Sequence, residues 1–572
     1  MDIKMRLAEK IRQTAQKAIA EGVVKEGALP EVLLTVPPKK EFGDFATNFA
    51  MQSARSLHCN PRVLAQYIVE HLTGGYVQKA EIAGPGFINF YLNPDWVWDM
   101  LAEIVEAGEN YGNLPPVAGE KIQLEYVSAN PTGPLHVGHG RGAAVGSALG
   151  NLLKAAGYQV EREYYINDAG NQMDNLARSV NARYLELSGR TCEFPEDGYH
   201  GQDIVETARR ILNKYGDKFL QMEEAERLEQ FKTIAYEEKL AALREDLEHF
   251  NVHFDFWFSE KTLHEANKIK EACDTLLAKG YMYEKDGALW LKTSDILAAQ
   301  LRQEGKSDEA IEKLGLKDDV LRRANGFYTY FAADIAYHRN KFEKRGFDRV
   351  INIWGADHHG HVKRLQCALD ALGLDGSHRL EIVLMQLVRM MQGGEVVRMS
   401  KRTGKAISLT DLLDEIPVDA CRWFFNAKPE TQMEFDLGLA VREDSENPVY
   451  YVQYAYARIC TLVKALAAEG YTVPAAAKAD LSVLTADEEK ALIKQLAQYP
   501  AVVQLAARDY DPSFINRYLV ELAAAFHKFY NACRIKGEAE AVLRARLKLA
   551  DTARAVLKNG MTLIGCSAPE KM

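Results

Sequence analysis

The chain has 572 residues, which is too long for a single hydrophobic core, so we expect about three or four domains of ordinary size. Hydrophobic residues make up 47% and charged residues 26% of it, a balance that excludes a largely disordered or fibrous protein. The formal net charge of -10 excludes a uniformly basic nucleic-acid binder, although local patches can still meet RNA.

Targeting and metal-binding signals are absent from the sequence pattern. No run approaches the roughly 18 apolar residues of a membrane span, and charges interrupt MDIKMRLAEKIRQ where a signal peptide needs its apolar region. The eight cysteines are scattered, without a CxxC or a close Cys/His cluster. We therefore expect a cytoplasmic protein with reduced thiols, no membrane contact and no structural metal.

Residues 1–115 predict a small α+β domain. Residues 1–20 have the pattern of an amphipathic helix whose basic residues favour a solvated face over an RNA patch. Strand and turn segments follow, including AEIAGPGFINFYL at 80–92. The polar, turn-rich EAGENYGNLPPVAGEK then indicates a domain boundary near residue 115.

Residues 116–445 predict an α/β domain, and residues 446–572 a helical bundle. The order strand (KIQLEYV), Gly/Pro loop, small-residue helix and strand (QVEREYYIN) is a βαβ unit, which implies a parallel sheet with ligands at the carboxyl ends of its strands. A charged helical insertion at about 170–250 precedes the sheet-like FDFWFS, GALWLK and RVINIWGADHH. The chain after 445 has almost wholly helical periodicity.

The loop from Ser128 to His139, SANPTGPLHVGH, is the most informative segment. It lies between a strand and a helix, where free backbone N–H groups and glycines can receive a phosphate. His136 and His139 lie three residues apart and can donate hydrogen bonds to phosphoryl oxygens from one side of the first helical turn. An isolated HxxH favours a surface or metal-binding pair, but this glycine-rich setting favours a nucleotide site.

Two further segments carry possible ligands. VVRMSKRTGKAISL at 396–409 is a basic loop that suits polyphosphate, although such loops are often only solvated surface. GADHHGH at 355–361 ends an apolar strand, and its Asp357 can hold a ribose. A histidine-rich metal site formed by Asp357, His358, His359 and His361 is the alternative there.

The order of strand, HVGH, long insertion, RMSKR and helical carboxyl domain resembles class I aminoacyl-tRNA synthetases, whose two motifs are written HIGH and KMSKS. The resemblance implies a multidomain α/β protein with a Rossmann-like parallel-sheet catalytic domain. It implies catalytic roles for His136, His139 and Lys401. Arg398 stands where the first motif lysine is expected and Arg402 where a serine is usual, so Lys401 and not Arg398 takes the catalytic role. The ATP-binding residues that it implies are His136, Gly138, His139, Asp357, Met399 and Lys401.

Acidic candidates indicate a cationic amino acid. A guanidinium calls for carboxylates and an aromatic partner, and Glu125, Asp334 and Tyr330 fit, although ordinary surface acids would give the same pattern. EYVSANPTGPLHVGH, YYINDAGNQ, YFAADIAYH and WGADHHGHV are similar to arginyl-tRNA synthetases, over nearly the whole chain. The resemblance implies that arginine is bound by Glu125, Ser128, Asn130, Tyr330, Asp334 and His358.

The resemblance also implies partners. They are L-arginine, ATP with Mg²⁺ held mainly through the phosphates, and tRNA(Arg), whose terminal adenosine would receive arginine on its 2′-hydroxyl. The strand GPGFINF and the aromatic helix in NPVYYVQYAYARI are the candidates for RNA contact. The alternative is a core position for Phe87 and for half of the aromatic residues of the helix. The tRNA-binding candidates are Phe87, Asn89, Tyr454, Tyr456 and Arg458.

Two other readings compete with the synthetase. A small adenylyltransferase shares the HxGH loop but does not need this length or a helical carboxyl domain. A catalytically inactive, synthetase-like RNA-binding protein would be expected to lose the histidines, Lys401 or the substrate carboxylates, and all are present. We expect a monomer that binds no DNA.

Overall fold

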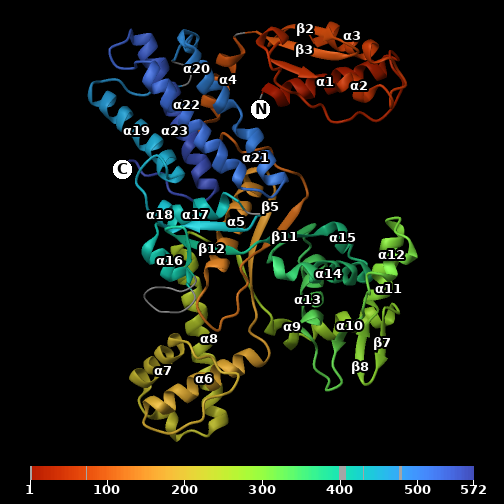
Figure 1. Ribbon diagram of the computed structural model, residues 1–572, viewed down its shortest axis with the longest axis vertical. Helices are drawn as coiled ribbons and strands as arrows, with labels where there is room; N and C mark the ends of the chain where they lie inside the picture. Colours follow the sequence, from red (N-terminus) through yellow and green to blue (C-terminus); the bar gives the residue numbers. More distant parts are fainter. Residues whose placement is uncertain (1–2, 73, 94, 398–406, 429–430, 476–478) are drawn as a thin grey trace.

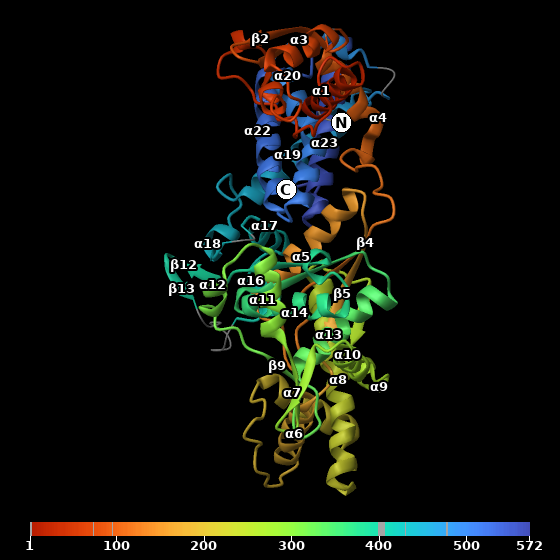
Figure 2. The ribbon, with the colours of Figure 1, turned by 90° about the vertical axis from the view of Figure 1, so that its right-hand side faces the viewer.

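The computed structural model describes residues 3–72, 74–93, 95–397, 407–428, 431–475 and 479–572, and forms an elongated molecule of several packed units (Figures 1 and 2). In Figure 1 the amino-terminal unit lies beside the carboxyl-terminal bundle at one end, and a helical insertion forms the other end. In the described part of the chain, no helix is both long and apolar enough to cross a membrane.

The amino-terminal unit packs helices on a small antiparallel sheet of order β1-β3-β2. The apolar side of α1 is buried at every third or fourth position (Leu7, Ile11, Ala15 and Ala18), as its sequence pattern predicts. The elements are α1 (Ile3–Ala20), β1 (Phe45–Thr47), α2 (Phe49–Ser53), α3 (Pro61–Leu72), β2 (Val77–Ala83) and β3 (Phe87–Leu92).

The next helix, α4 (Trp96–Ala107), belongs by packing to the other end of the chain. It packs on α20, the Trp98 indole donates to the Leu484 carbonyl, and the Tyr111 hydroxyl donates to the Leu496 carbonyl. Residues 96–111, which the sequence placed in the amino-terminal domain, therefore connect to the carboxyl-terminal bundle. That bundle consists of α19 (Pro448–Ala468), α20 (Asp487–Ala497), α21 (Tyr499–Arg508), α22 (Ser513–Ala532) and α23 (Glu540–Leu563).

A five-stranded parallel sheet of order β11-β10-β4-β5-β6 forms the centre of the molecule. Its inner strands are buried on both faces because helices cover them, as for β4, where four of five residues (Ile122, Gln123, Leu124 and Glu125) are buried. The strands are β4 (Lys121–Glu125), β5 (Gln159–Ile166), β6 (Phe256–Ser259), β10 (Arg349–Gly355) and β11 (Leu380–Met385). The helices that connect strands of this sheet directly are α5 (Val137–Ala155) and α14 (His359–Leu372).

Two insertions interrupt this sheet. The predicted helical insertion follows β5 and is formed by α6 (Asn171–Leu187), α7 (Gln202–Tyr215) and α8 (Glu224–His249). A second insertion follows β6 and has its own antiparallel sheet of order β7-β8-β9. GALWLK, which the sequence presented as a continuation of the main sheet, forms β8 there instead. This insertion includes α10 (Lys268–Ala278), β7 (Met282–Lys285), β8 (Ala288–Leu291), α11 (Thr293–Gln303) and β9 (Asp319–Arg322).

The chain returns to the main sheet through α13 (Tyr330–Arg339), which continues as a π-helical turn over Asn340–Lys344. After β11, a smaller sheet of order β13-β12-β14 leads toward the bundle. Its elements are β12 (Val388–Gln392), β13 (Glu395–Val397), α16 (Leu409–Glu415), α17 (Val418–Asn426) and β14 (Met433–Asp436).

Candidate active site

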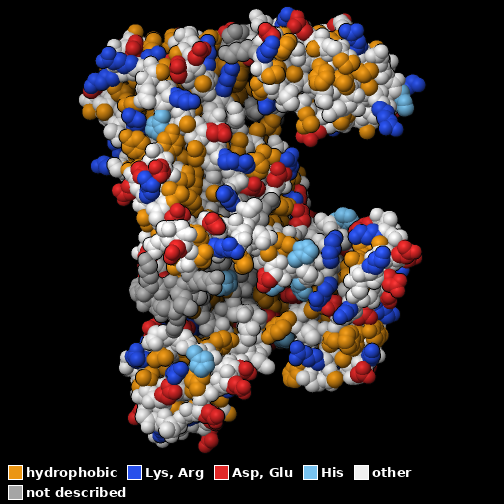
Figure 3. Space-filling view, viewed as in Figure 1, with side chains coloured by type: hydrophobic (Ala, Val, Ile, Leu, Met, Phe, Trp, Pro, Cys, Tyr) orange, Lys and Arg blue, Asp and Glu red, His pale blue; other side chains and the backbone are white. Residues whose placement is uncertain are grey.

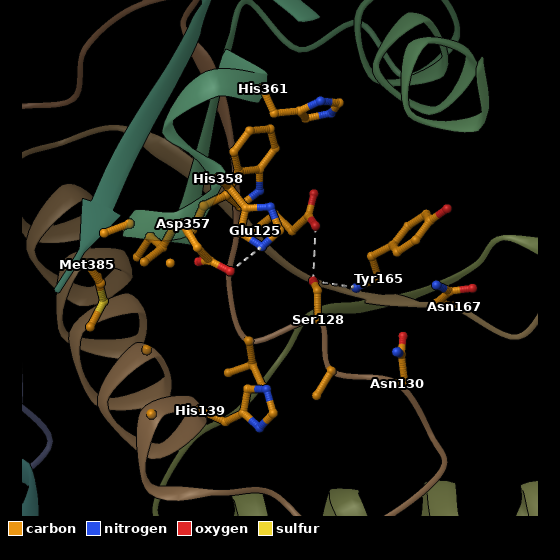
Figure 4. Close-up of a pocket in the computed structure, with 18 of the residues that line it drawn as sticks. Glu125, Ser128, Asn130, His139, Tyr165, Asn167, Asp357, His358, His361 and Met385 are labelled. Atoms are coloured by element: carbon orange, nitrogen blue, oxygen red, sulfur yellow. Dashed lines mark hydrogen bonds and ion pairs between the residues drawn. The ribbon is translucent and has the colours of Figure 1, made fainter. Parts of the chain in front are cut away.

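A cleft of about 1430 Å³ opens at the carboxyl ends of the parallel strands (Figure 4). This is where an open α/β sheet holds its ligands, because the loops that follow the strands gather there. The cleft brings together every described amino-acid and nucleotide candidate of the sequence. They are Glu125, Ser128, Asn130, His136, Gly138, His139, Tyr330, Asp334, Asp357 and His358.

The two histidines of HVGH form a reciprocal cap on the first turn of α5. His136 is the N-cap residue; its Nδ1 accepts from the His139 backbone N–H at 3.3 Å, and the His139 Nδ1 accepts from the His136 backbone N–H at 3.3 Å. The rings stack with their centroids 3.6 Å apart. Because both Nδ1 atoms are acceptors, each neutral ring carries its proton on Nε2.

Burial keeps both rings uncharged at neutral pH. It lowers the pKa of His136, and it lowers the pKa of His139 to about 4, with a smaller contribution from the neighbouring imidazole. Gly138 lies between them, and a Cβ there would come within 2.9 Å of the His136 ring. Two neutral N–H donors at a helix amino terminus can therefore donate hydrogen bonds to an anionic phosphate.

The backbone just before this loop is held in an uncommon conformation. Val127 and Ser128 have φ of 70° and 43°, a region that β-branched residues rarely adopt. The Ser128 hydroxyl donates to Glu125 Oε1 at 3.0 Å and accepts from the Tyr165 backbone N–H at 3.1 Å. Strained residues that their neighbours hold in this way are common in binding sites.

Acidic side chains gather on the β4–β6 side of the cleft. Glu125 is 6% exposed, and its Oε2 lies 2.6 Å from Lys341 Nζ. Asp334 lies on α13, one turn after the exposed Tyr330, and its Oδ2 is 2.8 Å from His361 Nε2. Glu260, immediately after β6, is 4% exposed, and burial raises the pKa of its carboxyl. This wall of the cleft suits an organic cation.

The opposite wall comes from the loop after β10. Asp357 and His358 lie on a 3-10 turn (Ala356–His358), where they are well exposed, with His358 Nε2 3.7 Å from Asp357 Oδ2. Within the described residues, no group of three or more His, Cys, Asp or Glu side chains is placed to hold a metal ion. His361 lies beside Asp334 and does not join Asp357, His358 and His359 in such a group.

Comparison with known proteins finds matches along nearly the whole chain. Three family models match: "Arginyl tRNA synthetase N terminal domain" at residues 5–92, "tRNA synthetases class I (R), catalytic domain" at 103–436, and "DALR anticodon binding domain" at 452–572. An arginine--tRNA ligase of Carboxydothermus hydrogenoformans is 51% identical over 94% of both chains. One of Acetivibrio thermocellus is 46% identical over 100% of this chain and 99% of its own.

The chain belongs to the arginyl-tRNA synthetase family. A solved Thermus thermophilus arginyl-tRNA synthetase has a TM-score of 0.73 over the full length of both chains; at 21% identity it supports the fold alone. Family membership confirms three predictions from the sequence: the family itself, the multidomain class I fold with a parallel-sheet domain, and the class of enzyme, an aminoacyl-tRNA ligase.

Two candidates of the second motif, Met399 and Lys401, lie outside the described residues, as do Arg398 and Arg402. The chain that follows them is described and lies against the histidine loop. Ser408 pairs with His136 in an isolated β-bridge, and the Leu409 N–H donates to the Leu135 carbonyl at 2.7 Å. Ser408 follows Lys401 by only seven positions, a span of at most roughly 25 Å.

The tRNA-binding candidates separate into exposed and buried residues. Phe87 is 41% exposed, and Asn89 lines a second hollow of about 620 Å³ beside it. Tyr454 is 43% exposed on α19, one turn before Arg458, whose guanidinium lies 5.7 Å from the Tyr454 ring centroid. Tyr456 is only 3% exposed, because two residues along a helix turn a side chain to the opposite face. The prediction that Tyr456 faces RNA is wrong.

Several cleft residues were not predicted. Each of them lies near the carboxyl end of a strand or within a few residues after it, so an accurate prediction of where the strands end would have indicated them. They are Tyr165 near the end of β5, Asn167 after β5, Glu260 after β6, Trp354 near the end of β10, Met385 at the end of β11 and Gln386 after it. Lys341 had no signal in the sequence, because only its contact with Glu125, 216 residues away, distinguishes it.

Proposed function

We propose that this protein activates L-arginine with ATP and transfers it to the 2′-hydroxyl of the terminal adenosine of tRNA(Arg). In the first step the arginine carboxylate forms a bond to the α-phosphorus of ATP, and the bond to pyrophosphate breaks. One observation carries the proposal: two neutral Nε2–H donors at the start of α5 share a cleft with an acidic wall. Those donors would stabilise the negative charge that builds on the phosphoryl oxygens.

Arginine is the amino acid that fits the acidic wall best. A guanidinium can meet Asp334 and Tyr330 from α13 and Glu125 from β4, while Ser128 and Asn130 would hold the α-amino and carboxylate groups together with His358. A lysine ammonium cannot satisfy two forked acceptors at once, and an unpaired carboxylate in a closed site is costly. Selection of arginine over lysine would therefore come from binding, without a separate editing domain.

ATP would lie on the side of the histidines. Gly138 would allow close approach at the helix start, and Asp357, which lines the cleft after β10, would hold the ribose. Lys401 and Met399 would complete the nucleotide site from the segment that ends beside His136. Mg²⁺ would arrive with ATP and be held mainly by the phosphates.

Exposed aromatic residues of the amino-terminal unit and of the carboxyl-terminal bundle would contact tRNA. Figure 3 shows a hollow between the amino-terminal unit and the lobe that carries the second insertion. Phe87 and Asn89 would meet the tRNA elbow, and Tyr454 with Arg458 would stack on anticodon bases. We also propose that the protein acts as a cytoplasmic monomer and binds no DNA.

Pyrophosphate exchange with each amino acid, run with and without tRNA(Arg), tests the proposal. We expect radiolabelled pyrophosphate to enter ATP with arginine and not with lysine, glutamine or glutamate. Running both arms separates an enzyme that requires bound tRNA from one that does not. Exchange with lysine or glutamine but not with arginine would overturn the assignment. Absence of exchange in both arms, with tRNA still bound, would favour the inactive RNA-binding alternative.

A further inference from the structure

Lys341 is a fully buried cation beside the candidate arginine site. Its Nζ lies 2.6 Å from Glu125 Oε2 and 3.2 Å from Asn352 Oδ1, and 4.1 Å from the centroid of the Tyr337 ring. A buried ammonium is costly unless it is paired and hydrogen-bonded, and these three partners meet that requirement. Glu125 therefore lines the cleft while paired with a lysine that is fully buried behind it.

Lys341 also begins a chain of hydrogen bonds whose direction is determined. Asn352 accepts from Lys341 and donates to His338 Nε2 at 2.8 Å, and His338 Nδ1 donates to the Asp334 carbonyl at 2.8 Å. This arrangement requires a neutral imidazole; burial, and next the Lys341 ammonium, hold the pKa of His338 well below its ordinary value. The chain connects Lys341 to the backbone of Asp334.

The local backbone explains how Lys341 reaches this position. It lies in the π-helical turn Asn340–Lys344 that continues α13, the helix that carries Tyr330 and Asp334. Such turns are rare and are frequent at functional sites. In the parallel sheet Glu125 is in register with Asn352 of β10 and with Glu163 of β5. Lys341 thus joins the helix that carries Asp334 to the strand that carries Glu125.

We propose that Lys341 is a positioning residue for amino-acid binding, which fixes the orientation of Glu125 in the part of the cleft that would receive the guanidinium. The inference rests on the proposed function, because arginine is the ligand whose binding it would support. Glu125 gives Oε2 to Lys341 and Oε1 to Ser128, so its orientation is set before a ligand enters. Ser128 in turn belongs to the strained turn before the HVGH loop.

Lys341→Met tests this role through the KM for arginine, compared with kcat and with the KM for ATP. Without the ammonium, Glu125 loses the partner that holds its Oε2. We expect the arginine KM to rise about tenfold, with kcat and the KM for ATP changed less than about twofold. Lys341→Arg keeps the cation and should restore most of the wild-type arginine KM.

Two further variants separate positioning from general destabilisation. Glu125→Gln/Lys341→Met removes both charges, and its arginine KM should equal that of Glu125→Gln, because Lys341 acts through Glu125. Lys239→Met is the matched control: Lys239 is also nearly buried, and its Nζ is 2.7 Å from Asp203 Oδ2, but it lies in the helical insertion. It should lower the melting temperature without changing the arginine KM.

If Lys341→Met does not fold, Lys341→Gln takes its place, since its amide keeps a donor in the buried position. A wild-type arginine KM in the folded variant would overturn the inference. Lack of arginine-dependent exchange by the wild type would instead overturn the proposed function.

Discussion

Replacing Asp334 by asparagine would remove one negative charge from the acidic wall with little change in volume. A hydrogen bond to a charged group contributes about 1.5–3 kcal/mol, which corresponds to roughly ten- to a hundredfold in kcat/KM. The Asp334 side chain is 33% exposed and already accepts from His361, so solvent screening places the expected loss near the lower limit. We therefore expect kcat/KM for arginine to fall about tenfold.

The measurement is pyrophosphate exchange against arginine concentration at saturating ATP and tRNA. The KM for ATP should change little, because Asp334 lies on α13 and its carboxylate contacts His361 and not the histidines of the HVGH loop. Asp375→Asn is the matched control: Asp375 also pairs with a histidine, at 2.6 Å from His378, but on the exposed surface. Its φ of 55° suits asparagine equally well. Unchanged arginine kinetics in Asp334→Asn would remove Asp334 from the binding site.

Four other predictions follow from the geometry. His139→Asn should lower the exchange rate about a hundredfold by removing one phosphate donor. The wild-type rate at saturating substrates should stay level from about pH 6 to 8, because the His139 pKa of about 4 leaves the ring neutral there; a midpoint near 6.5 would contradict this. Gly146→Ala would put a Cβ 2.2 Å from the Tyr126 ring, so the melting temperature should fall by about 3 °C or more, whereas Gly142→Ala, with nothing within 4 Å, should not lower it. Tyr454→Ala should weaken tRNA binding about tenfold in a filter assay through lost base stacking, while Tyr456→Phe, at a buried position, should leave it unchanged.

The sequence predicts those parts of the site that have local causes. The apolar strand, the glycine-rich loop and the small-residue helix place the histidines at the start of α5 because each signal lies within a few residues of its effect. The strand itself ends at Glu125, two residues before the predicted end. Val127 and Ser128 turn into the left-handed region there, and bonds from β4 and β5 hold them. A residue pattern does not reveal such a turn.

Long-range packing accounts for what the sequence did not predict. GALWLK has a strand pattern, but its partners are β7 and β9, so it joins a separate sheet. Residues 96–107 have an ordinary amphipathic pattern, which says that one face is buried but not that α20 covers it. In the sequence, Lys341 is an ordinary basic residue near the end of a helix. Its role depends on a strand 216 residues earlier.

The strand order explains why the nucleotide and the amino acid would meet at β4. From β4 the chain runs through α5 to β5 on one side, whereas β10 and β11 extend the sheet on the other, so the loops after β4 and β10 leave in different directions. A crevice opens at such a switch point. The HVGH loop follows β4, and Asp357 follows β10, so the nucleotide candidates line that crevice. Both insertions leave after β5 and β6, beside the acidic wall. They can therefore shape access to the amino-acid side without moving the phosphate donors at the start of α5.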